Sequence, residues 1–260
     1  ITIKDLASAV AEPIGILLTV LLPVGSTEED LAKIMEDAEE ACSRYSLQVL
    51  GGHTETTAVV SQPLVSVTGV AKAKKGRLLS TGGAKPGMDL VATKWIGIEG
   101  TSILAKEREE ALRERFAGEY VARARELDRF LCVLPEGRIA AEMGAGAMHD
   151  VTEGGILGAL WEMAEASGVG VEVWLSEIPI RQETVEICEF FDINPYRLIS
   201  SGCMLVAIED GHALVRRLEQ EGIPARVIGR ATEGSDRVVL AGDRRQYLTP
   251  PEADELYKAL

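Results

Sequence analysis

The sequence predicts a mixed α/β (α+β) protein with two domains. Apolar runs of strand length alternate with amphipathic stretches of helical period along the chain, and neither type dominates. A chain of 260 residues is long enough for two domains of ordinary size. Residues 72–88, KAKKGRLLSTGGAKPGM, concentrate lysine, glycine and proline and form the best candidate for a boundary. We therefore expect one domain over residues 1–80 and a second over residues 81–260.

Three strands and one helix are expected in the first domain. The run IGILLTVLLP, residues 14–23, is a buried strand, because a membrane span needs about 20 apolar residues. A helix begins at Ser26, which has capping-box spacing with Glu29. Its core-facing positions recur at helical spacing: Leu31, Ile34, Met35, Ala38 and Cys42. LQVLGG is then a strand that ends at Gly51–Gly52, HTETTAVVSQ is a polar loop, and PLVSVTGVA is a further strand.

The second domain is expected to alternate short strands and helices. The strands cover residues 89–97, 169–175, 203–208, 225–231 and 238–242. Helical stretches cover residues 99–116, 127–133, 139–143, 184–191 and 212–220, and the segment 251–260 closes the chain. Another helix opens at Gly154–Gly155. Its apolar stripe predicts that it docks on a core: Ile156, Leu157, Leu160, Trp161 and Ala164.

Composition excludes several classes of protein. A formal net charge of −14 repels phosphate backbones and anionic lipids, so we expect no nucleic-acid partner and no membrane partner. Binding of a small anionic ligand is still compatible with this net charge, because backbone amides and a divalent metal can make the local potential positive. No two cysteines form a CxxC pair, which indicates free thiols in a reducing cytoplasm: Cys42, Cys132, Cys188 and Cys203. The first residue is not Met, so we expect that residues precede Ile1.

Polar clusters stand at the ends of four expected elements. In KDLASAVAEP, Asp5 precedes an apolar helical run, and the simplest interpretation is a helix N-cap. In TKWIGIEGT, Lys94 can meet a phosphate or lie exposed at a strand edge. In GGHTET the two glycines permit close backbone approach, whereas a turn with solvated side chains is the simpler alternative. The candidate residues of GGHTET are Gly51, Gly52, His53, Thr54 and Glu55.

The fourth cluster, HDVTEGG, opens a helix. Gly154 and Gly155 stand where the first helical N–H groups and the positive end of the dipole can hold a phosphate, with Thr152 beside them. Asp150 would repel a bare phosphate, but Mg²⁺ between the two anions makes the arrangement consistent. No GxxxxGK[ST] loop occurs, and no GxGxxG follows a strand. The residues alone therefore indicate an enzyme-like domain with a candidate metal–anion site.

Several ordered motifs together resemble the superfamily of aminoimidazole ribonucleotide (AIR) synthetase, and most of all its hydrogenase maturation (HypE) branch. HDVTEGGILGALWEMAEASGVGVEV and the later IPIR resemble that branch's D-x-T-x-GG turn, helix and IP-x-R step. GIPARVIGRATEG resembles its late strands. In the first half, DLASAVAEP resembles the N-D-[IL]-A-x-x-GA-x-P metal-site helix, and GGHTE stands where relatives carry GGDT or GGET. The likeness covers nearly the whole chain.

The resemblance implies a two-domain PurM-like architecture, in which the N-terminal domain dimerises and its strands form a barrel with those of the partner. It implies ATP and Mg²⁺ as cofactors, and phosphorylation of a carbonyl-type oxygen on a small-molecule or protein-borne substrate. Asp5 and Asp150 are the implied metal ligands, and Asp150 is also a catalytic candidate. His53 replaces an acidic or neutral residue, so hydrogen bonding to phosphate and acid–base catalysis both stay open. The candidate nucleotide-binding residues are Gly51, Gly52, Thr54, Glu55, Lys94, Thr152, Gly154 and Gly155.

Three departures from the family pattern limit this transfer. The HypE branch reacts on a carboxamide carried by its C-terminal cysteine, whereas this sequence ends in YKAL and Cys203 is a poor substitute. We find no counterpart of the family's N-terminal glycine- and aspartate-bearing segment, which helps to clamp the triphosphate. Lys4 and Val10 stand where relatives carry Asn and Gly. A lysine beside Asp5 either displaces a cation or supplies the positive charge itself.

Three hypotheses on function follow. The first is an ATP-dependent enzyme that phosphorylates or dehydrates a substrate other than its own tail. The second is a nucleotide-binding but non-catalytic partner or regulator in maturation, which the Lys4 change and the missing clamp favour. The third is a metabolite-binding scaffold that does not bind ATP. Binding of Mg-ATP separates the third from the other two, and release of phosphate separates the first from the second.

Overall fold

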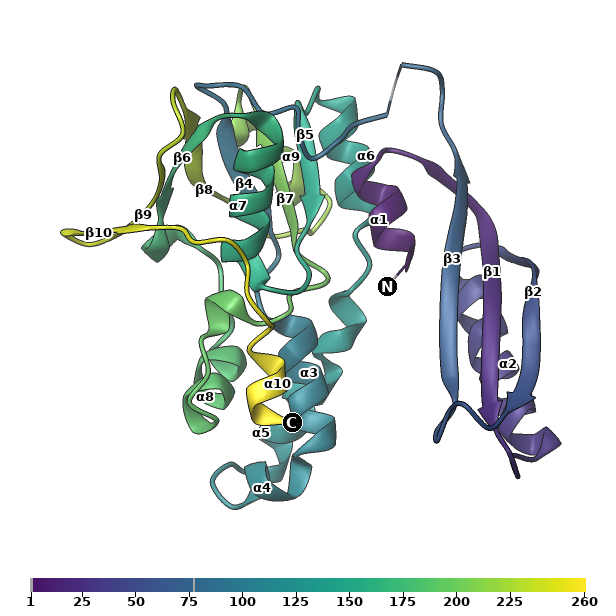
Figure 1. Ribbon diagram of the computed structural model, residues 1–260. Helices are drawn as coiled ribbons and strands as arrows, with labels where there is room; N and C mark the ends of the chain where they lie inside the picture. The colour runs from purple at the N-terminus through teal and green to yellow at the C-terminus, as the bar shows by residue number, and fades with distance from the viewer. Residues whose placement is uncertain (1, 77) are drawn as a thin grey trace. The chain divides into compact units, whose positions relative to one another are not determined.

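The computed structural model describes residues 2–76 and 78–260, which form two compact units. The larger unit comprises Leu79–Leu260 together with Ile3–Val10, and the smaller comprises Ala11–Leu78. Helix α1 (Thr2–Ser8) therefore packs mainly with the larger unit, although it precedes the smaller unit in the sequence. Each unit has its own sheet and helices (Figure 1), which confirms the expected mixed α/β class.

The smaller unit is a three-stranded sheet with one helix, as far as the structure describes it. Its elements are β1 (Glu12–Pro23), α2 (Glu28–Arg44), β2 (Gln48–Thr57) and β3 (Leu64–Lys72). The central strand β1 pairs in parallel with β2 and antiparallel with β3. Apolar residues on alternate positions of β1 pack against α2: Leu18, Val20 and Leu22 meet Leu31, Ile34 and Ala38. Helix α2 thus covers one face of this sheet as predicted, but Met35, which was expected to face the core, is exposed.

The helix α2 starts one residue later than predicted. Thr27, not Ser26, is the N-cap: its side chain accepts a hydrogen bond from the N–H of Asp30 at 3.2 Å, and the Asp30 carboxylate accepts one from the N–H of Thr27 at 2.8 Å. The capping box therefore exists, but with Asp30 in the role expected for Glu29.

The strand β2 continues beyond the position where it was expected to end. The prediction that residues 53–57 lie in a loop is wrong, because the backbone pairing with β1 runs on past Gly52 to Thr57. A register shift between Ile16 and Leu17 leaves an extra residue on β2 next to the two glycines. A Cβ atom on Gly52 would lie 1.8 Å from the carbonyl oxygen of Leu18, so glycine here permits strand pairing rather than a turn.

Within the described residues, the larger unit contains a seven-stranded sheet with the order β10-β9-β6-β8-β4-β7-β5. The strands are β4 (Asp89–Thr93), β5 (Ala147–Asp150), β6 (Gly170–Trp174), β7 (Met204–Ile208), β8 (Ala225–Thr232), β9 (Arg237–Ala241) and β10 (Arg244–Tyr247). Strand β6 pairs with β9 in parallel, and the other pairs described are antiparallel. Strands β5 and β10 were not predicted, because four residues are too few to establish an apolar alternation.

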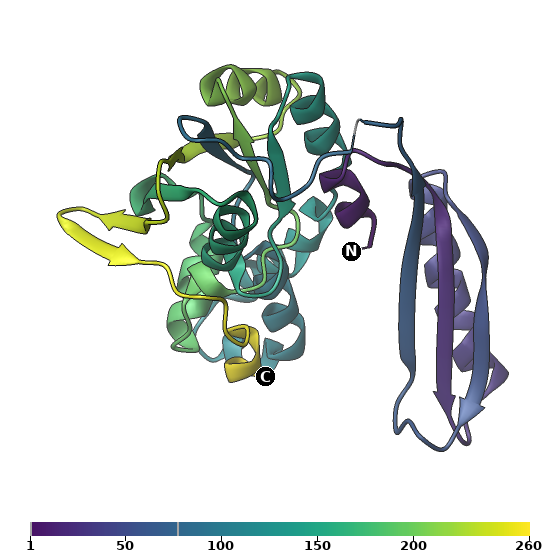
Figure 2. The same cartoon turned by 45° about the horizontal axis from the view of Figure 1, so that its top comes forward.

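Helices cover both faces of this sheet (Figure 2). Helix α7 (Gly155–Ser167) covers one face, and α6 (Leu134–Glu142) and α9 (Gly211–Gln220) cover the other. A further group of helices packs together in a separate core: α3 (Ile98–Glu107), α4 (Glu109–Arg113), α5 (Gly118–Arg125), α8 (Gln182–Phe190) and α10 (Leu256–Ala259). Short 3₁₀ segments are η1 (Glu126–Phe130), η2 (Leu175–Glu177) and η3 (Pro195–Arg197). The expected helix 99–116 is interrupted at Arg108, and the expected helix 127–133 is replaced by η1.

Neighbouring residues of each central strand belong to different cores. Leu90 of β4 faces α7, whereas Val91 faces the side of α6 and α9. The same alternation holds for Leu205 and Val206 of β7, as the two-residue period of a strand requires. Within the described residues, no helix has both the length and the apolar character that a membrane crossing needs.

Candidate functional site

The site is built around Asp150, the last residue of the edge strand β5. Asp150 pairs with Met204 of β7, and its side chain points to the face of the sheet that α1 and α6 cover. His149 precedes it and points to the opposite face, where α7 lies. This division follows from strand geometry, because successive side chains alternate between the two faces. Asp150 is buried, with 8% of its surface exposed.

Helix α1 places Lys4 and Asp5 next to Asp150. Ala7 belongs to the core formed by α6 and α9, which anchors α1 on the larger unit. A Cβ atom on Gly137 of α6 would lie 2.6 Å from the carbonyl oxygen of Ala7, so the glycine allows the two helices to approach closely. Val10, which ends this segment, has a φ angle of 58°, a left-handed conformation that disfavours a β-branched residue.

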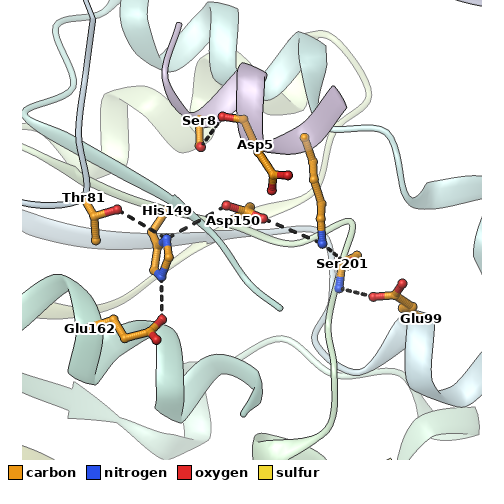
Figure 3. Close-up of polar contacts among 9 residues, drawn as sticks. Asp5, Ser8, Thr81, Glu99, His149, Asp150, Glu162 and Ser201 are labelled. Carbon is orange, nitrogen blue, oxygen red and sulfur yellow. Dashed lines mark hydrogen bonds and ion pairs between the residues drawn. The ribbon is translucent and has the colours of Figure 1, made fainter. Parts of the chain in front are cut away.

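The carboxylates of Asp5 and Asp150 point toward each other (Figure 3). Although Asp5 has an exposed surface, partial desolvation raises the pKa of its carboxyl to about 6. The next causes are a hydrogen bond with Asp150 and repulsion by the charge of Asp150, while Lys4 lowers the pKa. Two carboxyl groups 145 positions apart in the sequence thus share one small volume. Asp5 is not an N-cap, because it lies within α1.

Lys4 is buried beside this carboxylate pair. Its ammonium lies 3.7 Å from Asp150 Oδ2 and donates a hydrogen bond to Ser201 Oγ at 2.5 Å. The main-chain N–H of Ser201 in turn donates to Glu99 Oε2 at 3.1 Å. Sequence reasoning identified Lys4 as a departure from the family pattern, but it did not predict that only 6% of the residue would be exposed.

His149 is a second residue that sequence reasoning did not single out. Its Nε2 atom lies 2.7 Å from Glu162 Oε2 of α7, and its Nδ1 atom lies 3.4 Å from Thr81 Oγ1 and 4.0 Å from Asp150 Oδ1. Its place directly before Asp150 in HDVTEGG was the only signal available. The contacts hold the imidazole between α7, β5 and the segment that enters the larger unit.

The donor set fits a hard divalent cation only in part. Asp5 and Asp150 supply carboxylate oxygens, which Mg²⁺ prefers, and the raised pKa of Asp5 reflects two such groups held together. Across residues 2–76 and 78–260, however, no group of three or more His, Cys, Asp or Glu side chains is arranged to hold a metal ion. Mg²⁺ that keeps several waters and binds phosphate oxygens needs only one or two protein carboxylates, so the pair is sufficient for that mode.

The GGHTET residues lie in the smaller unit, on β2. In the register with β1, Gly51, His53 and Glu55 share the sheet face away from α2, whereas Thr54 is on the face of Val20. His53 Nε2 lies 3.2 Å from Glu55 Oε2, and both side chains are more than half exposed. The expected roles of Gly51, Gly52, His53, Thr54 and Glu55 stay predictions.

The glycines of HDVTEGG do not present free amides. The N–H of Gly154 donates to Asp254 Oδ2 at 2.8 Å, and the N–H of Gly155 donates to the carbonyl oxygen of Thr152 at 3.0 Å. Both glycines have positive φ angles, and a Cβ atom on Gly155 would lie 2.5 Å from the carbonyl oxygen of Tyr196. A carboxylate of the same chain caps the start of α7 in this structure, and the expectation that Gly154 and Gly155 form a phosphate turn stays a prediction that these contacts do not support.

Lys94 is neither an exposed residue nor a free phosphate ligand. Its ammonium pairs with Glu136 Oε1 at 2.6 Å and donates to the carbonyl oxygens of Phe130 at 2.8 Å and Cys132 at 2.5 Å. An ammonium has three N–H donors, so these contacts use all of them. Burial raises the pKa of the nearby Cys203 thiol to about 12, so this cysteine is a poor nucleophile or carrier thiol.

Comparison with known proteins shows which family the chain matches. The family model "AIR synthase related protein, C-terminal domain" matches residues 85–241, and the N-terminal domain model of the same name matches residues 1–73. A putative hydrogenase expression/formation protein of Methanocaldococcus jannaschii is 27% identical over 243 residues, which are 92% of this chain and 70% of that protein. Carbamoyl dehydratase HypE of Rhodobacter capsulatus is 27% identical over 236 residues, which are 88% of this chain and 67% of that protein.

A solved structure has the same fold. The crystal structure of the hydrogenase maturation protein HypE in complex with ATP matches 100% of this chain and 79% of its own, with a TM-score of 0.80 and 18% sequence identity. The two family models together cover most of the sequence, in the order N-terminal domain and then C-terminal domain. The chain belongs to the AIR synthase related protein family, of the PurM-like superfamily, and its relatives point to the HypE branch.

Proposed function

We propose that the protein is an ATP- and Mg²⁺-dependent enzyme that activates a carbonyl-type oxygen by phosphorylation, in the maturation of hydrogenase. The observation that carries the proposal is the meeting of Asp5 and Asp150, which come from the two motifs of the family pattern. Relatives named carbamoyl dehydratase and a related fold solved with ATP support this class of chemistry. The acceptor is a small molecule or a group carried on another protein.

In this proposal Asp5 and Asp150 would hold Mg²⁺ through their carboxylate oxygens. The bound ion supplies charge neutralisation for the transferring phosphoryl group. Asp150 is fixed for this task by its strand and by Lys4, and Asp5 by the packing of α1. Gly154, Gly155 and Lys94 have no part in the proposed site, since their donors bond within the chain.

We also propose that the smaller unit mediates a homodimer. Apolar side chains stay exposed on the face of its sheet away from α2: Leu17 at 41%, Leu50 at 45% and Leu64 at 48%. A partner's sheet would bury this surface, as the strand pairing implied by the family resemblance requires. In that arrangement His53 and Glu55 would lie at the seam between subunits, where the family resemblance suggests that they contact nucleotide.

The second candidate function is a nucleotide-binding partner or regulator without catalysis. One observation favours it: the ammonium of Lys4 lies 3.7 Å from Asp150 Oδ2 and takes part of the charge compensation that a metal ion would supply. Such a protein would bind ATP and would not release phosphate.

Two measurements test these proposals. A thermal shift with Mg-ATP is expected, because a ligand at 100 times its Kd stabilises the native state by about 2.7 kcal/mol. Phosphate release from ATP should then fall about a hundredfold in Asp150→Asn, since metal-assisted charge stabilisation is worth several kcal/mol. Asp128→Asn, which alters an exposed carboxylate paired with Lys106, is the matched control and should keep the wild-type rate. Turnover that persists in Asp150→Asn removes Asp150 from the metal role, and binding without turnover selects the second candidate.

A further inference from the structure

Lys4 is held in one position by three segments of the larger unit. Its stem is buried within α1, its ammonium faces Asp150 at the end of β5, and it donates to Ser201 in the loop before β7. Ser201 is itself buried and is fixed through its N–H by the carboxylate of Glu99 on α3. A lysine side chain normally keeps most of its rotamer freedom at a surface, so this fixation is a specific feature of the site.

The group formed by Lys4, Asp5 and Asp150 has more acidic than basic side chains. The two facing carboxylates carry up to two negative charges, and Lys4 supplies one positive charge within 3.7 Å of one of them. A divalent cation bound to the same carboxylates would lie close to this ammonium, and the two positive charges would repel each other in a partly buried site. The arrangement therefore favours a lower affinity for a divalent cation than an uncharged residue at position 4 would give.

We propose that Lys4 is the residue that sets the metal requirement of this site: it acts as a tethered cation that supplies charge otherwise provided by a divalent ion. The carboxylate pair consequently binds Mg²⁺ weakly on its own, and ligand binding depends less steeply on free Mg²⁺ than it would with a neutral residue. The inference rests on the proposed function only for the identity of the ligand, ATP. The effect on metal affinity follows from the local charges alone.

The direct test is a titration of the whole chain with Mn²⁺ in the absence of nucleotide, followed by the electron paramagnetic resonance signal of free Mn²⁺. Mn²⁺ accepts the same oxygen ligands as Mg²⁺. Lys4→Met, which removes the charge and keeps the length of the side chain, should bind Mn²⁺ at least about tenfold more tightly than wild type. Lys4→Arg keeps the charge and should stay close to wild type. The matched control is Lys106→Met, an exposed lysine paired with Asp128, and it should leave the affinity unchanged.

The double variant Lys4→Met/Asp150→Asn locates the effect, because the gain in affinity should disappear with the carboxylate. Equal affinities in wild type and Lys4→Met, with unaltered melting temperatures, would overturn the proposal, and so would a gain that survives in the double variant. If Lys4→Met does not fold, Lys4→Gln gives the same comparison, since its amide can still donate to Ser201.

A second arm separates this inference from the proposed function. The Kd of ATP is measured over a range of free Mg²⁺ concentrations for wild type and Lys4→Met. A steeper dependence in Lys4→Met is expected. A rise in Mn²⁺ affinity without ATP binding in either protein supports the role of Lys4 and contradicts the proposed function. ATP binding with the same Mg²⁺ dependence and the same Mn²⁺ affinity in both proteins supports the proposed function and overturns the role of Lys4.

Discussion

Replacing Asp254 by alanine should strongly destabilise the larger unit. Asp254 lies in the segment before α10 and has only 2% of its surface exposed. Its carboxylate accepts three main-chain hydrogen bonds: from Gly154 at 2.8 Å, from Leu256 at 2.9 Å and from Ile199 at 3.2 Å. One side chain thus connects the start of α7, the loop after η3 and the C-terminal segment. The alanine variant leaves all three donors without this partner.

The magnitude follows from these three contacts. A buried donor left without its partner costs about 1–3 kcal/mol, and the charge at the start of α7 adds a favourable dipole interaction that is also lost. Water can reach some of the donors, so we expect a loss of about 3–5 kcal/mol rather than the full sum. In a unit of this size each kcal/mol lowers Tm by roughly 2–4 °C, so Tm should fall by roughly 6–20 °C.

Urea unfolding followed by tryptophan fluorescence measures this loss. All the tryptophans, Trp95, Trp161 and Trp174, lie in the larger unit, so the signal reports on that unit and not on the smaller one. The matched control is Asp210→Ala, which removes an exposed carboxylate that accepts one N–H, from Ala213 at 2.8 Å, at the start of α9. An N-cap of this kind is worth about 1 kcal/mol. If Asp254→Ala costs no more than Asp210→Ala, the carboxylate does not hold the three segments together.

Two further predictions concern charged groups in the larger unit. Lys94→Met should cost about 3–5 kcal/mol, because it leaves Glu136 buried without its counter-charge, and Lys94→Met/Glu136→Leu should recover much of that loss in the same urea assay. A single variant within 1 kcal/mol of wild type, or a double variant no better than the single, would contradict this role. For Asp5, the pKa is raised from its ordinary value of 3.8 to about 6 in the folded chain, so the folded state binds more protons than the unfolded state between these values. This contribution to stability is present below about pH 4 and is lost as the pH rises through about 6. In metal-free buffer Asp5→Asn should lack this loss, and equal slopes of stability against pH in both proteins would show that the carboxyl pair is not coupled.

Much of the fold could be predicted because long apolar patterns decide it. The strand β1 is a continuous apolar run, the helices α2 and α7 each show a clear helical period, and each of the three lies within a few residues of its expected bounds. The strand β2 was cut short because Gly51–Gly52 resembles a turn locally, whereas its pairing with β1 is decided by residues more than 30 positions away. Local propensity carries no information about such a partner.

The site was less predictable than the fold. Asp150 was noticed because it precedes a glycine pair that opens a helix, whereas Asp5 became a metal-ligand candidate only through the resemblance of DLASAVAEP to the family's metal-site helix. The sequence could not predict the environments of Lys4 and Lys94, since both depend on carboxylates far along the chain: Lys4 on Asp150, and Lys94 on Glu136. A lysine is normally exposed, and only the tertiary structure shows that these two are paired inside the protein.

The residues of the HDVTEGG motif do not all belong to the candidate site. They serve different purposes, and the geometry of a strand followed by a helix assigns them. Because side chains alternate along β5, His149 faces α7 and Asp150 faces α1. The two glycines then allow the chain to turn into α7, and Asp254 accepts a hydrogen bond from the N–H of Gly154 at its start. An alanine at Gly154 would be strained by its φ angle of 79° whether or not the protein binds phosphate, so loss of activity in that variant would say nothing about chemistry. Asp150→Asn changes one functional group at nearly constant shape. Because it also removes the charge paired with buried Lys4, its melting temperature and its rate must be measured together to separate catalysis from folding.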